Sequence, residues 1–179
     1  MKKLSAIAIG LTLALSGCST MTPARYSVSV DNNLILKKYA GQTTRIISMD
    51  PPANYDSNCR LMGPIQASDG MTIPQFVQKA FNDELKFASI YSENGNSIAG
   101  ALTKIQFSSA SGLTSGWWDL GLTLKASNGK TISVENRYDF KSGFDAITAC
   151  NQTAQALAPA VQDLIKKAIS DPAFAELLQ

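Results

Sequence analysis

Cysteine has the most distinctive chemistry of any residue type in this sequence, which contains Cys18, Cys59 and Cys150 but no histidine. A cysteine thiol can accept a covalent group, form a disulfide or bind a soft metal ion. Without histidine, the chain cannot use a Ser-His or Cys-His nucleophile, a histidine proton shuttle or an imidazole-bound metal. Two cysteines beyond the first supply too few soft ligands for zinc, and no GxGxxG or P-loop motif occurs. We therefore expect neither a metal nor a cofactor.

The beginning of the chain is typical of an export signal. Lys2 and Lys3 precede an apolar run, residues 4–15, that is followed by two small residues. This order is that of a secretory signal peptide, and the run is too short to cross a bilayer. We therefore predict a signal peptide over residues 1–17. Its removal leaves 14 basic and 14 acidic residues, a balance that gives no electrostatic basis for binding nucleic acid.

The segment Leu15–Cys18 resembles the lipobox of bacterial lipoproteins, in which small residues precede a cysteine that accepts diacylglycerol and becomes the mature N-terminus. The resemblance implies a lipidated Cys18 whose fatty chains, such as palmitate, anchor the protein to a membrane. Gram-negative lipoproteins with an aspartate after that cysteine usually stay in the inner membrane, but Ser19 stands here. The resemblance therefore implies a periplasm-facing lipoprotein of the outer membrane.

Two alternatives to this address remain open. A Gram-positive source would place the anchor on the plasma membrane, and a chance cysteine would leave an ordinary secreted protein. In the lipoprotein case, residues 18–26 form a lipidated tether, because they are small and polar and include a proline. Residues 27–179 then form one domain, since their number and apolar content suit a single core.

Export also bears on the other two cysteines. An oxidising compartment favours disulfides, and only one pairing is possible once Cys18 carries lipid, so we predict a Cys59–Cys150 disulfide. In the chain-entropy model, closing a loop of about 90 residues contributes roughly 4–5 kcal/mol to stability. Two separate buried thiols are the alternative, because cysteine is among the most often buried residue types.

The carboxylates give little sign of catalysis. Asp83 and Glu84 are neighbours on an expected helix, so their side chains point in different directions. Three further carboxylates fall on one face of an expected sheet: Asp119, Glu135 and Asp139. Lys125 and Arg137 alternate with them there, which is more typical of a solvated surface with cross-strand ion pairs than of a glycosidase site. We therefore expect no catalytic residue and no enzyme activity.

Paired tryptophans follow a glycine-containing stretch, residues 111–118 (SGLTSGWW), which could present aromatic anchors from a loop. In the competing interpretation, Trp118 belongs to the core and Trp117 shields a sheet face. The candidate interaction surface on that face consists of Trp117, Asp119, Lys125 and Arg137.

Hydrophobic periodicity predicts the elements that position these residues. One helix follows Thr72 as N-cap and continues to about Ala88, and a second runs over 144–170, where Pro159 should kink or divide it. A short terminal helix follows Asp171 as cap. Strands or extended segments are expected at 26–30, 43–49, 59–66, 98–108, 117–126 and 131–140, the last two joined at Asn128-Gly129. The fold class is α+β: an antiparallel sheet with two long helices packed on one face and a short C-terminal helix.

From residue 72 to its end, the chain resembles the YajG-type bacterial outer-membrane lipoproteins, a group without an assigned activity. The shared features include the lipobox, the helix–strand–hairpin–helix order, and the segments 126–129, 143–144 and 170–176 with Tyr138. The resemblance implies an envelope lipoprotein and names no substrate.

Two functions follow. The first is a non-catalytic envelope lipoprotein that binds a protein or peptidoglycan, marked by an exposed apolar patch on the face with Trp117. The alternative is a lipoprotein that holds a lipid or small hydrophobic ligand between sheet and helices. It would need an unfilled cavity lined by Phe76, Phe81, Trp118 and Phe140. The apolar stripes are sufficient to fill the core, which favours the first.

Overall fold

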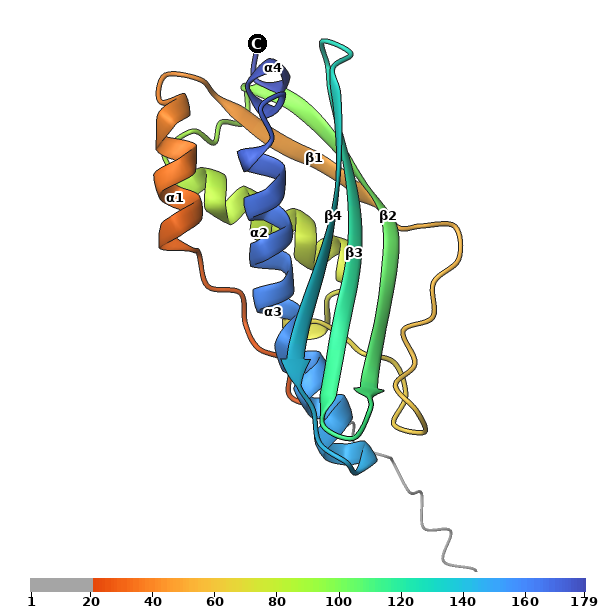
Figure 1. Cartoon of the computed structure of the whole chain (residues 1–179). Helices are drawn as coiled ribbons and strands as arrows, with labels where there is room; N and C mark the ends of the chain where they lie inside the picture. The colour runs from red at the N-terminus through yellow and green to blue at the C-terminus, as the bar shows by residue number, and fades with distance from the viewer. Residues whose placement is uncertain (1–20) are drawn as a thin grey trace, which may run out of the picture.

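The computed structural model of the protein describes residues 21–179, in which helices cover one face of a four-stranded sheet (Figure 1). The predicted signal peptide and Cys18 lie outside the described residues. The elements are α1 (Val30–Leu36), β1 (Thr44–Asp50), α2 (Ile73–Phe87), β2 (Asn96–Ser111), β3 (Ser115–Ala126), β4 (Thr131–Lys141), α3 (Ala146–Ser170) and α4 (Phe174–Leu177). No helix among the described residues is long and apolar enough to cross a membrane.

The α+β fold class is confirmed, and the strand order is β1-β2-β3-β4. β2, β3 and β4 form the antiparallel meander expected from their alternation. β1 differs from the expected pattern because it pairs parallel to β2. The connection between β1 and β2 contains α2. Such a crossover returns the chain to the end of the sheet at which β1 begins, so β2 runs in the same direction as β1.

The core lies between the sheet and the two long helices. Inward residues of β2 and β3, including Leu102, Leu120 and Leu122, are buried and α3 packs on these strands, whereas α2 packs on β1. α2 begins as expected: the Thr72 hydroxyl accepts from the backbone N–H of Gln75, whose side chain accepts from that of Thr72. At the β3–β4 turn, only Gly129 adopts a positive φ, of 84°, which a residue with a side chain rarely tolerates.

Two details expected of α3 differ in the structure. Of the two effects expected of Pro159, a kink or a division, the division does not occur, because the helix is continuous from Ala146 to Ser170. The apolar side chains on both sides of Pro159, such as Leu157 and Val161, are buried in the core, and this packing offsets the lost hydrogen bond. Ile147, expected in the buried stripe, is exposed because it lies in the first turn, at the end of the sheet.

Two expected strands are absent from the described chain. Residues 26–29 are irregular, and Ser29 caps α1 by accepting from the backbone N–H of Asn32. Residues 59–63 form a tight turn, in which the N–H of Cys59 donates to the carbonyl of Gly63. Asp171 does accept a hydrogen bond near the last helix, from the N–H of Ala173 at 2.8 Å, but α4 itself begins at Phe174.

Candidate functional site

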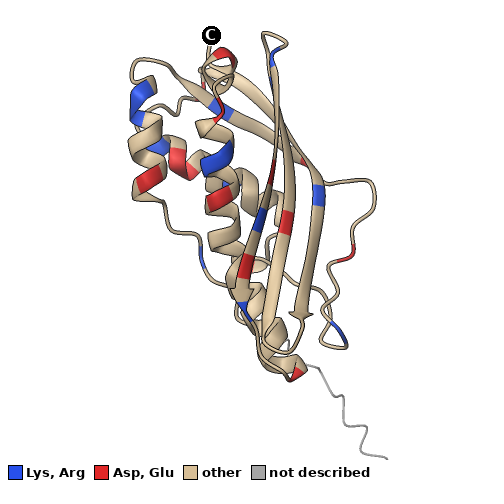
Figure 2. Cartoon of the chain, viewed as in Figure 1, with Lys and Arg blue, Asp and Glu red and all other residues tan. Residues whose placement is uncertain are grey.

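The sheet face turned away from the helices carries the candidate interaction surface, and charged residues alternate along its strands (Figure 2). Trp117 and Asp119 point outward from β3, and Arg137 lies opposite Asp119 on β4. The guanidinium of Arg137 stacks over the Trp117 ring at 4.3 Å from its centroid, a cation–π contact. Three of the four predicted surface residues are therefore brought together.

Lys125 is not part of this group. It pairs with Thr131 of β4 and Ala99 of β2, at the opposite end of β3 from Trp117. Lys125 follows Trp117 by eight positions along the strand, or about 26 Å at roughly 3.3 Å per residue. The register thus divides the predicted surface into a cluster around Trp117 and a remote lysine.

Lys104 of β2, which is not among the predicted surface residues, completes the cluster. Its ammonium lies 2.7 Å from a carboxylate oxygen of Glu135 and 3.5 Å from one of Asp119. The hydrogen bond to Glu135 raises the pKa of Lys104 above its ordinary value. Asp139 pairs with Arg137 at 3.2 Å. All three carboxylates of this face thus have a cationic partner, which favours the interpretation as an ion-paired surface over a catalytic pair.

The exposed apolar patch expected beside Trp117 is not found on this face within the described chain. The outward side chains of β4 and of β3 after Trp117 are polar or charged, except for glycine. They are Asp119, Thr123, Lys125, Thr131, Ser133, Glu135, Arg137 and Asp139. The strict alternation of the meander sends every large apolar side chain of these stretches to the core.

A groove of about 460 Å³ lies next to the Trp117 cluster. One wall is the irregular segment after β1, residues 52–58, and the other is residues 103–107 of β2, with Trp117 at the side. β1 pairs with β2 only as far as Ala101. Among the described residues, the rest of β2 therefore has a strand on one side only, and its other edge borders the groove.

The groove offers mainly polar contacts. Its lining residues include the polar or charged Asn54, Asp56, Asn58, Lys104 and Gln106 and the aromatic Tyr55 and Trp117. A strand edge with unpaired N–H and C=O groups is a template for an added strand, and flanking side chains can select its sequence. The arrangement is suited to an extended polypeptide.

Three of the rings expected to line a hydrophobic ligand cavity, those of Phe76, Phe81 and Trp118, are buried and contact other core side chains instead. Phe81 stacks on Phe174 with centroids 6.4 Å apart, and Tyr26 meets the edge of Phe76 at 5.9 Å. Trp118 is fully buried and donates its indole N–H to the carbonyl of Thr153 at 2.9 Å. These contacts favour a filled core.

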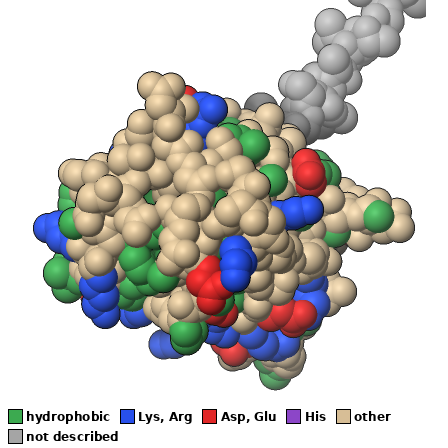
Figure 3. Space-filling model, turned by 90° about the horizontal axis from the view of Figure 1, so that it is seen from above, with side chains coloured by type: hydrophobic (Ala, Val, Ile, Leu, Met, Phe, Trp, Pro, Cys, Tyr) green, Lys and Arg blue, Asp and Glu red, His purple; other side chains and the backbone are tan. Residues whose placement is uncertain are grey.

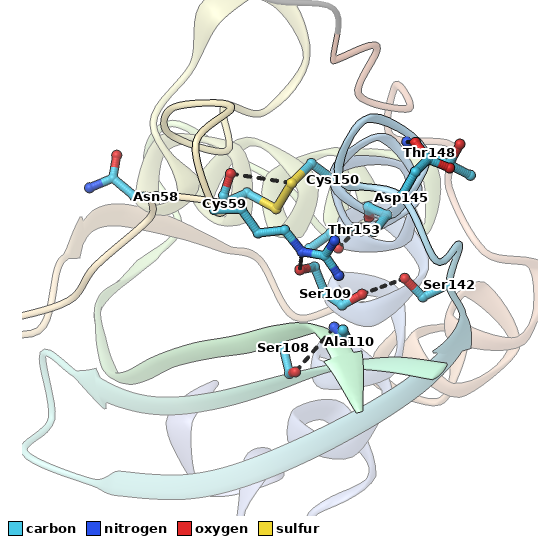
Figure 4. The surroundings of a disulfide bond; sticks show 12 residues. Asn58, Cys59, Ser108, Ser109, Ala110, Ser142, Asp145, Thr148, Cys150 and Thr153 are labelled. Carbon is cyan, nitrogen blue, oxygen red and sulfur yellow. Dashed lines mark hydrogen bonds between the residues drawn. A yellow bond between two sulfur atoms is a disulfide. The ribbon is translucent and has the colours of Figure 1, made fainter. Parts of the chain in front are cut away.

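The predicted Cys59–Cys150 disulfide is present, with its Cα atoms 5.8 Å apart (Figure 4). It joins the turn after the groove wall to the second turn of α3. Next to it, Arg60 donates from Nε to the Ser109 hydroxyl at 3.2 Å and from Nη1 to the Phe144 carbonyl at 3.3 Å. The disulfide and Arg60 together fix the 52–63 segment against the end of the sheet.

Glu84 is a buried acidic residue that was not among the predicted functional residues. Its Oε1 accepts from the Tyr26 hydroxyl at 2.6 Å, the Ser29 N–H at 2.9 Å and the Asn32 side-chain amide at 3.1 Å. Burial, and then the hydrogen bond to Glu84, raise the pKa of Tyr26 above its ordinary value. Glu84 thus holds the N-terminal segment on α2. A signal exists in the sequence, since Glu84 interrupts the apolar stripe of its helix.

Comparisons with known proteins yield fold likeness only. The sequence matches no protein-family model and no curated protein. The chain is similar to a Xanthomonas campestris protein of the DUF330 family, at 11% identity over 72% of this chain and 84% of that one, with a TM-score of 0.49. It is similar to a minor lipoprotein from Acinetobacter baumannii, at 11% identity over 75% and 92% of the two chains, with a TM-score of 0.40. PelC from Paraburkholderia phytofirmans, a dodecamer, is 12% identical over 77% and 96%, with a TM-score of 0.34. No site or partner is transferred from them.

Proposed function

We propose that this protein is a non-catalytic bacterial envelope lipoprotein that faces the periplasm from the outer membrane. In this proposal, lipid on Cys18 anchors the chain, and the groove beside Trp117 binds an extended segment of another envelope protein. The address is supported by the resemblance of Leu15–Cys18 to a lipobox. The mode of action is supported by the structure of β2 alone.

The observation that carries the proposal is the change in pairing along β2. Asn96–Ala101 lie between two strands, whereas the residues after Ala101 pair with β3 only. Edge strands in soluble proteins are usually shortened, charged or covered, because an open edge invites pairing with another chain. Here the 52–58 segment stands off from the edge and leaves a groove between them. The opening is therefore suited to one added chain.

Site-specific photocrosslinking in intact cells tests the proposal. A photoreactive amino acid at position 117 lies at the side of the groove, and the same residue at position 125 is a matched control on the same strand and face. We expect position 117 to capture an envelope protein and position 125 to capture none. Tyr55→Ala, which alters the opposite wall, should weaken that capture.

Three outcomes would contradict the proposal. Equal capture at both positions would mean that the groove has no special role. Capture of peptidoglycan fragments at position 117 would show that the groove binds a glycan and not a protein segment. A co-purified lipid with no captured partner would favour the ligand-binding alternative.

A further inference from the structure

Four of the large apolar side chains that are exposed in the described chain gather at one end of the domain, and the others lie separately on α1, β1 and α2. Among the described residues, Leu61 is completely exposed, and Phe144, Leu113 and Ile147 are 78%, 70% and 55% exposed. These four residues, which we call the apolar rim, come from three separate segments: the 59–63 turn, the β2–β3 turn and residues 144–147, which lead into α3 and begin it. Single exposed apolar residues need no explanation, but a group at one end of the molecule does.

Covalent and hydrogen bonds hold these three segments at the same end (Figures 1 and 4). The Cys59–Cys150 disulfide and the hydrogen bond from Arg60 to the Phe144 carbonyl join the 59–63 turn to α3. The N–H of Ser142, just before α3, donates to the carbonyl of Thr114 in the β2–β3 turn at 2.8 Å. The rim is therefore a fixed feature of the fold.

The N-terminal segment meets the domain at the same end. The backbone N–H of Thr22 donates to the side chain of Asn151 on α3 at 2.7 Å. Asn151 and Ile147 are four residues apart on this helix, so they lie on one face a single turn apart. Cys18 precedes Thr22 by four residues, a length of chain that spans at most about 14 Å. Lipid on Cys18 would therefore keep the apolar rim next to the membrane.

We propose that the apolar rim inserts into the membrane interface beside the lipid anchor and sets the domain upright on the bilayer. The proposal rests on the proposed lipid anchor at Cys18. Apolar side chains at such a contact enter about 5–10 Å into the boundary between headgroups and acyl chains. The opposite end, seen in Figure 3, shows charged and polar surface with apolar side chains scattered over it. The lipid chains hold the protein on the membrane, and the rim decides which end faces it.

Fluorescence quenching in vesicles tests the orientation. The mature chain with Phe144→Trp is reconstituted into vesicles of phosphatidylethanolamine and phosphatidylglycerol, with and without phospholipids brominated near the headgroup end of the acyl chain. Leu34→Trp is the matched control, because Leu34 is 60% exposed on α1, away from the rim. We expect a blue shift and loss of fluorescence from Phe144→Trp beyond the parent protein, and none from Leu34→Trp. Adding Leu61→Ser and Leu113→Ser to Phe144→Trp should reduce the loss.

The mass of the N-terminal peptide reports the anchor separately. If Cys18 is acylated and brominated lipids quench neither reporter, or both equally, the upright orientation is wrong while the lipoprotein proposal stands. If Cys18 is not acylated, the proposed address fails, and the same reporters are measured with vesicles added to the unacylated chain. Quenching confined to Phe144→Trp would then retain the rim as a membrane contact, and no quenching would overturn it. Shielding of Phe144 in cells without quenching in vesicles would identify a protein interface instead and also overturn it.

Discussion

The turns at the two ends of β3 differ in their contacts, and this difference distinguishes the two ends of the molecule. At the β3–β4 turn, the side-chain amide of Asn128 donates to the carbonyls of Glu176 and Gln179 at 2.7 and 3.1 Å. Asn96 likewise donates to the carbonyl of Leu177. At the β2–β3 turn, Leu113 is exposed. One end uses side-chain amides to satisfy the last carbonyls of the chain, and the other leaves apolar side chains uncovered.

This difference indicates that the two ends are stabilised by different means. The end with Asn128 closes through hydrogen bonds to the C-terminal residues. At the rim end, large apolar side chains are exposed, and a disulfide joins the 59–63 turn to α3 in addition to the hydrogen bonds of Arg60 and Ser142. Variants at each end therefore distinguish whether stability at the rim end comes from the disulfide and whether the exposed rim side chains contribute to it.

The largest effect should follow loss of the disulfide. In Cys59→Ala with Cys150→Ala, we expect the free energy of unfolding to fall by about 2–5 kcal/mol, because the unfolded chain regains the freedom of a long closed loop. Urea denaturation of the double variant and the parent, each with and without reductant, measures the loss. Reduction should lower the free energy of unfolding of the parent toward that of the variant and leave that of the variant unchanged. A double variant as stable as the oxidised parent would break the contrast between the ends.

Release of the N-terminal segment should cost somewhat less. Glu84→Ala leaves the Tyr26 hydroxyl, the Ser29 N–H and the Asn32 amide without their acceptor. At about 1 kcal/mol for each lost hydrogen bond, we expect a loss of about 3 kcal/mol. Tyr26→Phe removes only one of these bonds and should cost about 1 kcal/mol. Equal losses in the two variants would mean that Glu84 does not act as the common acceptor.

The hydrogen-bonded end should respond more weakly. Asn128→Ala removes the two bonds to the C-terminal carbonyls, and we expect a loss of about 1 kcal/mol, because both groups remain accessible to water. Chemical denaturation gives the loss, and hydrogen exchange of the α4 amides should rise in this variant more than that of β2. An unchanged exchange rate in α4 would show that Asn128 does not hold the C-terminus.

A smaller, pH-dependent effect is expected at the N-terminus of α3. The backbone N–H of Thr148 donates to the Asp145 carboxylate at 2.9 Å and lowers the pKa of Asp145. A carboxyl group whose pKa is lowered on folding stabilises the folded state at pH values above its unfolded pKa of about 3.9. This stabilisation is lost as the pH falls through the pKa of the folded state. Asp145→Asn keeps a good N-cap without the charge. The parent should therefore be more stable than the variant at pH 6, and the difference should shrink in acid. A constant difference would contradict this.

Much of the fold could be predicted from the sequence because the buried face of a helix or strand requires apolar residues at regular spacing. The alternation of residues 117–126 and 131–140 gave strands close to β3 and β4, and Thr72 marked the beginning of α2. Alternation over 26–30 was misleading, because Tyr26 is held by Glu84, a contact made through the tertiary fold. The parallel pairing of β1 also depends on the path of the chain rather than on its pattern.

Only those residues of the candidate site that lie on a single strand could be predicted from the sequence. Trp117 and Asp119 belong to one outward face of β3, and their alternation was visible. The groove wall at residues 52–58 has no periodicity, and its position depends on where β1 stops pairing. The rim could not be predicted for a similar reason, because Leu61, Leu113 and Phe144 are far apart in the sequence and their segments are joined only by the disulfide and by hydrogen bonds between turns.

The smallest effect on stability is expected at the rim. Leu113→Ser should change the free energy of unfolding in water by no more than about 0.5 kcal/mol, because an exposed side chain loses little burial when it is replaced. Leu120→Ser, on the same hairpin but fully buried, is the matched control and should cost several times more. Urea denaturation of both variants, in the absence of lipid, gives the comparison. A large loss from Leu113→Ser would show that the rim stabilises the domain itself. A near-neutral result would mean that Leu113 contributes little to the stability of the folded domain, as expected of a side chain whose contacts lie outside the protein.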